Sequence, residues 1–267
     1  MRIARFAKAG KDPAYGIIEL AVDGGEHPDT IATLTSDPLA GVQVNYTGER
    51  LPLEEVRLLA PVIPRSKVVG VGRNYADHAA ELGNEVPPAP LLFFKPNTSV
   101  IGPGDVIVRP AGCQELHYEG ELAVVIGRIC KEVPVERVAE VIFGYTAAND
   151  VTARDWQRSD GQWARAKGSD TFCPVGPWIN THWSIEEAER QGVETRLNDE
   201  VRQSGSTSQM VRGIAELVSY ISGFTTLLPG DLILTGTPSG VGPMADGDTV
   251  EVSIDGLGAL SNRVVGE

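Results

Sequence analysis

The chain has 267 residues, and 23 Lys and Arg stand against 36 Asp and Glu, so the formal net charge is −13. This charge and the lack of a basic patch argue against nucleic-acid binding, and no basic amphipathic stretch indicates a membrane surface. No apolar run approaches the ~18 residues of a membrane span, and the start, MRIARFAKAG, lacks a signal-peptide core. Three cysteines without CxxC spacing are typical of free thiols in a reducing compartment, so we expect a cytoplasmic protein.

The first 60 residues have the pattern of a small β-rich unit. Three short apolar or alternating runs, MRIARFA, YGIIELAV and DTIATLT, are separated by Gly, Pro and Asp. The segment LAPVIPRSK, residues 59–67, contains two prolines and is typical of a linker. We therefore expect a small N-terminal domain over 1–60 and a larger domain over 61–267.

Beyond the linker, candidate strands outnumber candidate helices, and they occur in hairpin-like pairs. The clearest elements are a buried strand at 67–72, a short helix at 74–84, a long strand at 116–127, a hairpin turn at Asn198-Asp199 and an amphipathic helix at 208–224. Hairpin pairs argue against a doubly wound parallel sheet, in which strands and helices alternate. The predicted fold class is α+β, and mostly β.

Two carboxylates, Glu119 and Glu121, lead into the apolar run Leu-Ala-Val-Val-Ile of the long candidate strand. Residues i and i+2 of a strand point to the same face, about 6–7 Å apart. Two carboxylates beside a buried strand are costly unless they are paired or bind a metal ion. The alternative is a solvated strand end, where alternating glutamates are common.

Asp150 ends a second run of apolar and small residues, 141–148, at a place where ligands often bind. An aspartate there can equally cap the helix that follows. Together with Glu119 and Glu121 it would form an all-oxygen set, which selects Mg²⁺, Mn²⁺ or Ca²⁺ over zinc. Three carboxylates would leave positions around the ion for water and substrate.

His78 and Glu81 lie three residues apart on the short candidate helix and share one face. A carboxylate that orients an imidazole is a usual general-base arrangement, although an exposed helix pair has the same spacing. Lys167, in a polar segment rich in turn formers, is a candidate to neutralise an anionic intermediate. Arg73 and Lys95 flank the helix and are candidates to bind a substrate carboxylate. A solvated side chain is the alternative for each of these three cations.

Six segments carry a more specific signal, because they occur together in a fixed order. They are GRNYADHAAEL (72–82), LLFFKP (91–96), HYEGELAVVIG (117–127), NDVTARDWQ (149–157), AKGSDTFCPVGPW (166–178) and PGDLILTGTPSGVG (229–242). In this order and spacing they resemble the fumarylacetoacetate hydrolase superfamily, from about residue 65 to the end of the chain. Residues 1–60 resemble the small variable domain that often precedes this fold.

The resemblance implies a catalytic domain built as a mixed β-roll with few helices, usually in a homodimer. It implies that Glu119, Glu121 and Asp150 bind Mg²⁺ or Mn²⁺, with Lys167 beside the metal. The substrate would be a small 2-oxo acid.

The same resemblance gives roles to four more residues. His78 and Glu81 match a dyad on a mobile lid that orders over the substrate. Gln157 and Thr237 match positions near the substrate carboxylate.

The hypothesis that follows is that a 2-oxo or 2-hydroxydienoate acid chelates the metal and that an enolate develops at C2. His78, oriented by Glu81, would move a proton or activate water. Three reactions share this site: isomerisation, as of 2-hydroxyhepta-2,4-diene-1,7-dioate, decarboxylation, as of oxaloacetate, and C–C hydrolysis of acylpyruvates or fumarylpyruvate. Family overlap favours an isomerase or decarboxylase of aromatic-compound catabolism. The rivals are a module that only binds a metal or small acid, which would need no base, and a structural Ca²⁺ protein.

Overall fold

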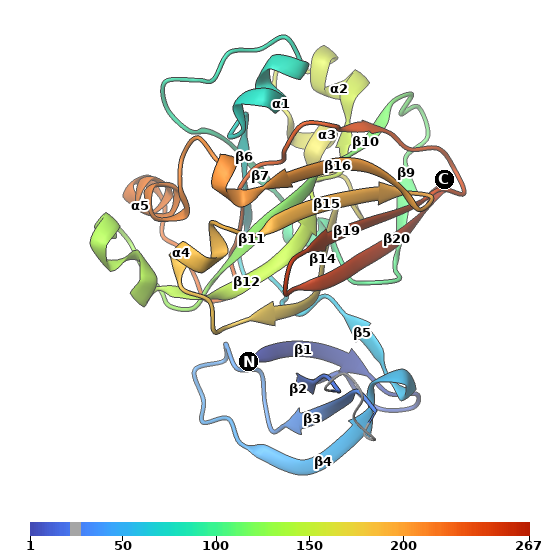
Figure 1. Ribbon diagram of the computed structural model, residues 1–267, viewed down its shortest axis with the longest axis vertical. Coiled ribbons are helices and arrows are strands. Elements are labelled where there is room, and N and C mark those ends of the chain that lie inside the picture. Colours follow the sequence, from blue (N-terminus) through green and yellow to red (C-terminus); the bar gives the residue numbers. More distant parts are fainter. Residues whose placement is uncertain (22–27) are drawn as a thin grey trace.

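The computed structural model describes residues 1–21 and 28–267, and strands dominate it (Figure 1). Within these ranges the largest sheet runs in the order β4 (Tyr46–Pro52), β3 (Thr30–Leu34), β2 (Ala14–Glu19), β1 (Arg2–Ala7), β14 (Cys173–Asn180), β12 (Ile142–Asn149), β11 (Gly120–Ile126), β17 (Leu232–Leu234), β6 (Val68–Gly72) and β7 (Leu91–Lys95). Two short strands attach to it, β5 (Arg57–Leu59) to β1 and β8 (Val100–Ile101) to β14. Most of its pairings are antiparallel, but β17 and β6 are parallel, so the sheet is mixed as predicted.

A second sheet packs across β11, β12 and β14 and closes the roll. Its order is β16 (Glu200–Ser206), β15 (Gly192–Leu197), β19 (Thr249–Ile254), β20 (Gly258–Gly266) and β9 (Val106–Arg109). A small third sheet consists of β13 (Thr152–Ala153), β10 (Leu116–Tyr118) and β18 (Gly242–Pro243). The predicted α+β, mostly β class is confirmed.

The helices are short, and they lie around the sheets (Figure 1). The α-helices are α1 (Ala76–Glu81), α2 (Arg154–Ser159), α3 (Ala164–Gly168), α4 (Ile185–Ala188) and α5 (Ile214–Phe224), and the 3₁₀ helices are η1 (Leu53–Glu55), η2 (Asn97–Ser99), η3 (Val135–Glu140) and η4 (Thr207–Gln209). Within the described ranges, none of them is both long and apolar enough to cross a membrane.

The core lies on both faces of β11, and all seven residues of this strand are buried. Leu122 and Val124 belong to the cluster that also contains the apolar face of α5, while Ala123 and Val125 belong to a second cluster. A strand that is buried on both faces needs a continuous apolar sequence rather than an alternating one. This requirement explains the run Leu-Ala-Val-Val-Ile, and it makes β11 a rigid support for the glutamates at its start.

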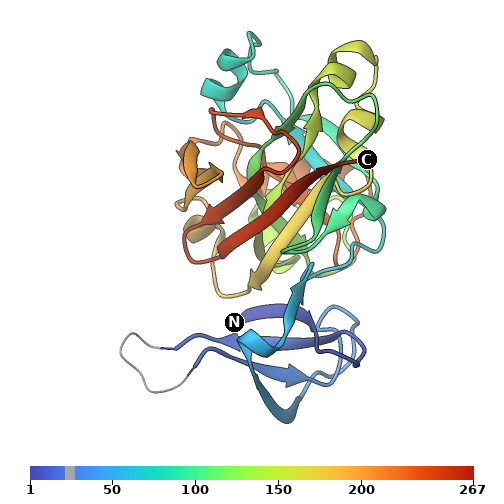
Figure 2. The ribbon, with the colours of Figure 1, turned by 90° about the vertical axis from the view of Figure 1, so that its right-hand side faces the viewer.

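The N-terminal strands continue the largest sheet. β1 pairs with β14 through Arg2–Asn180 and Ile3–Ile179, and β1 to β4 follow one another as antiparallel neighbours. In Figure 2 this N-terminal part forms a layer at one end of the molecule. The last residue of the second predicted run, Val22, lies outside the described residues.

The long predicted strand 116–127 is broken at Glu119. β10 pairs with β13 and β18, whereas β11 pairs with β12 and β17, so the chain changes sheets at this residue. The backbone N–H of Glu119 donates to Asn149 Oδ1 at 2.9 Å, and its carbonyl accepts from the N–H of Asp150 at 2.9 Å. The break therefore brings the ends of β11 and β12 together.

Two other local predictions have different outcomes. The hairpin turn at Asn198-Asp199 is confirmed, and both residues have positive φ, of 50° and 66°, as such a turn requires. The predicted helix 208–224 begins only at Ile214, because η4 precedes it and Met210 pairs with Tyr75 in an isolated β-bridge. The backbone contact with a distant segment outweighs the local helical pattern there.

A buried aspartate, Asp231, fixes the end of the linker against the start of β17. It accepts hydrogen bonds from Ser66 Oγ (2.6 Å), the backbone N–H of Lys67 (3.1 Å), Lys67 Nζ (2.7 Å) and the N–H of Leu228 (2.9 Å). Its side chain has no exposed surface, so every one of these donors would lose a partner without it.

We expect Asp231→Ala to lower the free energy of unfolding by about 3 kcal/mol, because it leaves a lysine and two backbone N–H groups without their acceptor. Urea unfolding followed by circular dichroism measures the change. Asp246→Ala is the matched control, because Asp246 forms an exposed ion pair with Arg109 and its loss should change stability by less than about 1 kcal/mol. Equal effects of the two variants would contradict a structural role for Asp231.

Candidate active site

Three carboxylates meet where β11 begins and β12 ends. Glu119 lies at the break before β11, Glu121 is the second residue of that strand, and Asp150 directly follows β12. The antiparallel register pairs Glu121 with Ala148, which brings Asp150 back beside Glu119. One oxygen from each of the three carboxylates lies within 4.8 Å of the others, and all three side chains are buried. This is the cluster that the sequence predicted.

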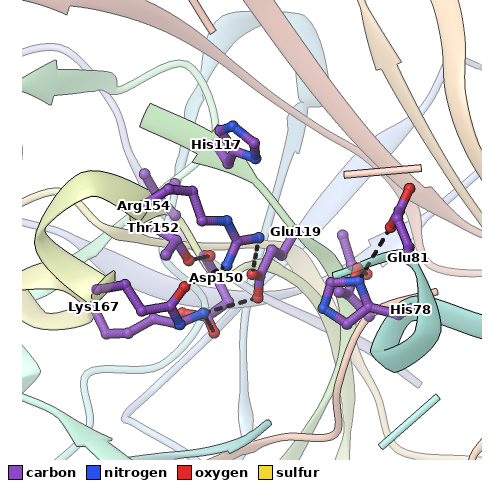
Figure 3. Close-up of polar contacts among 12 residues, drawn as sticks. His78, Glu81, His117, Glu119, Asp150, Thr152, Arg154 and Lys167 are labelled. Atoms are coloured by element: carbon purple, nitrogen blue, oxygen red, sulfur yellow. Dashed lines mark hydrogen bonds and ion pairs between the residues drawn. The ribbon is translucent and has the colours of Figure 1, made fainter. Parts of the chain in front are cut away.

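Three buried cations contact two of these carboxylates, and Figure 3 shows Arg154 and Lys167 among them. Lys167 Nζ donates to Glu119 Oε2 at 2.9 Å and to Asp150 Oδ2 at 2.6 Å, Lys95 contacts the other oxygen of Asp150, and Arg154 contacts Glu119. Burial opposes the ionisation of Glu119, but the charges of Arg154 and Lys167 outweigh it and hold its pKa below the usual range. Glu119 is therefore an anion at neutral pH.

Glu121 is in a different position. Its Oε2 accepts the backbone N–H of Gly236 at 2.6 Å, and no cation of the described chain pairs with it. Burial raises the pKa of Glu121 well above its ordinary value, and the neighbouring charges of Asp150 and Glu119 raise it further. The charge of Lys167 opposes this rise without overcoming it, and no cation of the described residues forms an ion pair with Glu121.

A divalent cation fits this arrangement. All three potential ligands are carboxylates. Mg²⁺ and Mn²⁺ prefer such oxygen ligands, whereas zinc sites often contain cysteine. Each carboxylate oxygen has two lone pairs, so Glu119 and Asp150 can contact a cation without losing Lys167. A bound cation would supply the positive charge that Glu121 lacks.

The cluster opens into a cavity of about 340 Å³, within the range of about 300–1,000 Å³ usual for small-molecule sites. Its walls combine the acidic cluster with cations and a few apolar side chains. The lining residues are Val71, Gly72, Arg73, His78, Leu82, Asn84, Glu119, Glu121, Arg154, Gln157, Arg158, Trp163, Lys167 and Thr237.

His78 reaches this cavity from α1, opposite the cations (Figure 3). Its Nδ1 lies 3.4 Å from Glu81 Oε2, and the backbone N–H of Gly240 donates to the same carboxylate at 3.0 and 3.2 Å. Burial lowers the pKa of His78 below its ordinary 6.5, although the charge of Glu119 partly opposes this. The imidazole is therefore neutral at pH 7 and able to accept a proton.

The other predicted residues have different surroundings. Gln157 lines the cavity and accepts from Arg154 Nη1 at 3.0 Å, and the Thr237 hydroxyl donates to the carbonyl of Gly120 at 2.8 Å. Arg73 also lines the cavity. Lys95 does not line the cavity, because its side chain has no exposed surface and forms an ion pair with Asp150. This placement does not support the expectation that Lys95 binds a substrate carboxylate.

Arg154 is one of the cavity residues that the sequence did not single out, and the one that contacts the acidic cluster. It is the first residue of α2 and is 4% exposed, with its guanidinium between Glu119 and Gln157. In the sequence it is one arginine among several in a polar segment, and only its spacing of three residues from Gln157 is informative. The contact with Glu119 depends on the change from one sheet to another between β10 and β11, which local sequence patterns do not reveal.

Comparison with known proteins agrees with the fold and the cluster. Residues 67–265 match the family described as fumarylacetoacetate (FAA) hydrolase C-terminal, and residues 1–61 match the Rv2993c-like N-terminal family. The chain belongs to the fumarylacetoacetate hydrolase family. It is 50% identical over 267 residues to protein Rv2993c of Mycobacterium tuberculosis, covering 99% of this chain and 98% of that one. It is 45% identical over 224 residues to the mitochondrial oxaloacetate tautomerase FAHD2A of Bos taurus, covering 80% and 71%.

Two solved structures of the family are informative. The 5-carboxymethyl-2-hydroxymuconate delta-isomerase of Mycobacterium smegmatis shares 48% identity over both whole chains, with a TM-score of 0.89. The maleylpyruvate hydrolase of Sphingobium sp. SYK-6, solved with a manganese(II) ion and pyruvate, shares 32% identity over 100% of this chain and 99% of that one, with a TM-score of 0.78. Family members are thus enzymes with isomerase, hydrolase and tautomerase activities, and membership alone leaves the reaction of this chain open.

We expect Glu121→Gln to weaken Mn²⁺ binding on the order of 100-fold, because the amide keeps the shape of the side chain but cannot supply the charge. Electron paramagnetic resonance of free Mn²⁺ measures the affinity. The exposed Glu140→Gln is the matched control and should bind as the wild type does. Unchanged affinity in Glu121→Gln would exclude this residue as a ligand.

In the wild type the Mn²⁺ affinity should fall as the pH is lowered, because the raised pKa of Glu121 means that a proton competes with the cation.

Proposed function

We propose that this chain is a divalent-metal-dependent enzyme that acts on small 2-oxo or 2-hydroxydienoate acids. The observation that carries the proposal is that Glu119 and Glu121, two of the three clustered carboxylates, line the same cavity as the neutral imidazole of His78. Glu119, Glu121 and Asp150 would hold Mg²⁺ or Mn²⁺, which acts as a Lewis acid on the oxygen of a 2-oxo acid. The manganese ion and pyruvate in the maleylpyruvate hydrolase structure support this choice of cation and ligand.

The chain's own residues divide the remaining work. Lys167 and Arg154 place two positive charges at the acidic cluster, where negative charge on the substrate oxygen is stabilised. Gln157 is positioned to hold the substrate carboxylate through its amide. Glu81 faces Nδ1 of His78, so Nδ1 carries the proton and Nε2 is left to accept one from carbon or from water.

Proton transfer within the substrate is the reaction that we favour, which makes the chain an isomerase of the 2-hydroxyhepta-2,4-diene-1,7-dioate type. A decarboxylase of aromatic catabolism, which would release CO₂ and leave the same enolate, belongs to the same proposal. Support comes from two relatives, a delta-isomerase and an oxaloacetate tautomerase, whose named reactions relocate protons or double bonds. C–C hydrolysis of an acylpyruvate or oxaloacetate decarboxylation is the second candidate, because a maleylpyruvate hydrolase has the same fold. A module that only binds a metal is less consistent with a buried base. Homodimer assembly and a role in aromatic-compound catabolism stay predictions.

We expect metal-stripped protein to be inactive on oxaloacetate, an acylpyruvate and a 2-hydroxydienoate, and to turn over at least one of them when Mn²⁺ is added. The enol absorbance follows all three reactions, and the products separate isomerisation, decarboxylation and hydrolysis. Glu119→Ala should lose the Mn²⁺-dependent activity, whereas Glu140→Ala should keep it. If none of the three acids reacts while Mn²⁺ binds tightly, the proposed substrate class is wrong.

We expect His78→Ala to lower kcat by about 10²–10⁴-fold with little change in Mn²⁺ affinity, because a general base contributes about that factor and does not touch the cation. The wild-type rate should fall on the acid side only below pH 6.5, since burial lowers the pKa of His78 and the protonated ring accepts no proton. Stopped-flow assays between pH 5 and 8 measure both quantities. Full turnover in His78→Ala would remove this residue from the mechanism and leave the metal site unaffected.

A further inference from the structure

Arg73 has a backbone conformation that is rare for its residue type. Its φ is +57°, in the left-handed region that glycine and asparagine adopt most readily. It follows directly after β6 and comes just before α1, the helix that carries His78. Side chains held in such a conformation often belong to binding sites, because the surrounding structure must enforce the strain.

The residue that holds the backbone next to Arg73 in place is Asn74, which is 2% exposed. Its Nδ2 donates to the carbonyls of Arg212 at 3.0 Å and Thr235 at 2.8 Å, and its Oδ1 accepts the N–H of Arg212 at 3.0 Å. Its own carbonyl accepts the N–H of Val211 at 2.7 Å. Asn74 is thus fixed through its side chain and its backbone, and it anchors the chain directly after Arg73.

Arg73 lines the cavity and is half-buried. No carboxylate within residues 1–21 and 28–267 forms an ion pair with it. The other cations of the cavity wall, Lys167, Arg154 and Arg158, each have an acidic partner. Arg73 therefore presents a positive charge to the cavity that the protein itself does not neutralise.

A series of contacts through two aromatic rings connects Lys167, beside the acidic cluster, with Gly72, the residue before Arg73. Lys167 Nζ lies 4.9 Å from the ring centre of Phe93, and the rings of Phe93 and Trp163 are 5.6 Å apart. Trp163 in turn lies against Gly72, where an added Cβ would be 3.2 Å from the indole. Lys167, Trp163, Gly72 and Arg73 thus line one cavity, and the apolar indole of Trp163 comes between the two cations in this series of contacts.

We propose that Arg73 binds a second carboxylate at the end of the substrate remote from the metal, and so selects dicarboxylic over monocarboxylic 2-oxo acids. This assignment rests on the proposed function, in which the first carboxylate and the 2-oxo group lie at the acidic cluster. A cavity of 340 Å³ corresponds to about eleven water-sized groups, enough for a chain of several carbons between two carboxylates. A guanidinium is suited to this role because it binds a carboxylate through two parallel hydrogen bonds.

The test compares two acids of equal length on the Mn²⁺-loaded protein, 2-oxoadipate with its second carboxylate and 2-oxohexanoate without it. Isothermal titration calorimetry measures both affinities in the wild type and in Arg73→Asn, in which asparagine tolerates the left-handed backbone. We expect Arg73→Asn to bind 2-oxoadipate roughly 10–100-fold more weakly, the range for a charge-assisted hydrogen-bonded pair, and 2-oxohexanoate within about twofold of the wild type. Arg73→Lys should retain part of the preference, because it keeps the charge and loses the bidentate geometry.

Arg158→Asn is the matched control, because Arg158 lies on the same cavity but is exposed and paired with Glu115. It should change either affinity by less than about threefold. Equal weakening of both acids in Arg73→Asn, or no weakening of either, would overturn the assignment of Arg73 while leaving the metal site in place. If neither acid binds the Mn²⁺-loaded wild type, the proposed function itself fails, and this assignment fails with it.

Discussion

The burial of three carboxylates within 4.8 Å of one another is the constraint on which the site depends. Ionised carboxylates in a low-dielectric interior are unfavourable unless each has a compensating charge. Separate elements supply the compensation: Lys95 from β7, Arg154 from α2 and Lys167 from α3 all converge on Glu119 and Asp150. The turns and short helices after β12 are therefore part of the electrostatic balance of the centre. Glu121 has no ion-pair partner among the described residues, and under the proposed function a metal cation would compensate its charge.

The centre joins parts with different support. The acidic cluster grows out of β11, which is buried on both faces and paired along both edges. The His78–Glu81 pair lies on a helix of six residues, which is joined to the rest through Asn74 and through the N–H of Gly240. The proposed metal ligands are thus fixed by the core, while the proposed base depends on a few hydrogen bonds. A substrate between them would contact both parts at once.

The acidic cluster was accessible from the sequence because its members mark the ends of apolar runs, and such ends meet when neighbouring strands are antiparallel. The pairing of Lys95 and Arg154 with this cluster was not, because nothing in LLFFKP or TARDWQ shows that either side chain turns inward. The break at Glu119 was missed for a related reason. The residues around it keep an alternating pattern, and only the competition between two sheets for the same segment interrupts the strand. Local periodicity therefore predicted the elements, while long-range pairing determined the site.

The pairing of β1 with β14 has a consequence for how the two matched family segments depend on each other. Asn180 of β14 pairs with Tyr145 of β12 along one edge and with Arg2 along the other, and Ile179 pairs with Ile3 along that second edge. Without the N-terminal layer, this end of β14 would present unpaired backbone groups beside the apolar side chain of Ile179, a template for adding strands from other molecules. The small N-terminal part thus shields a sheet edge against aggregation, a contribution to solubility that is independent of any part in catalysis.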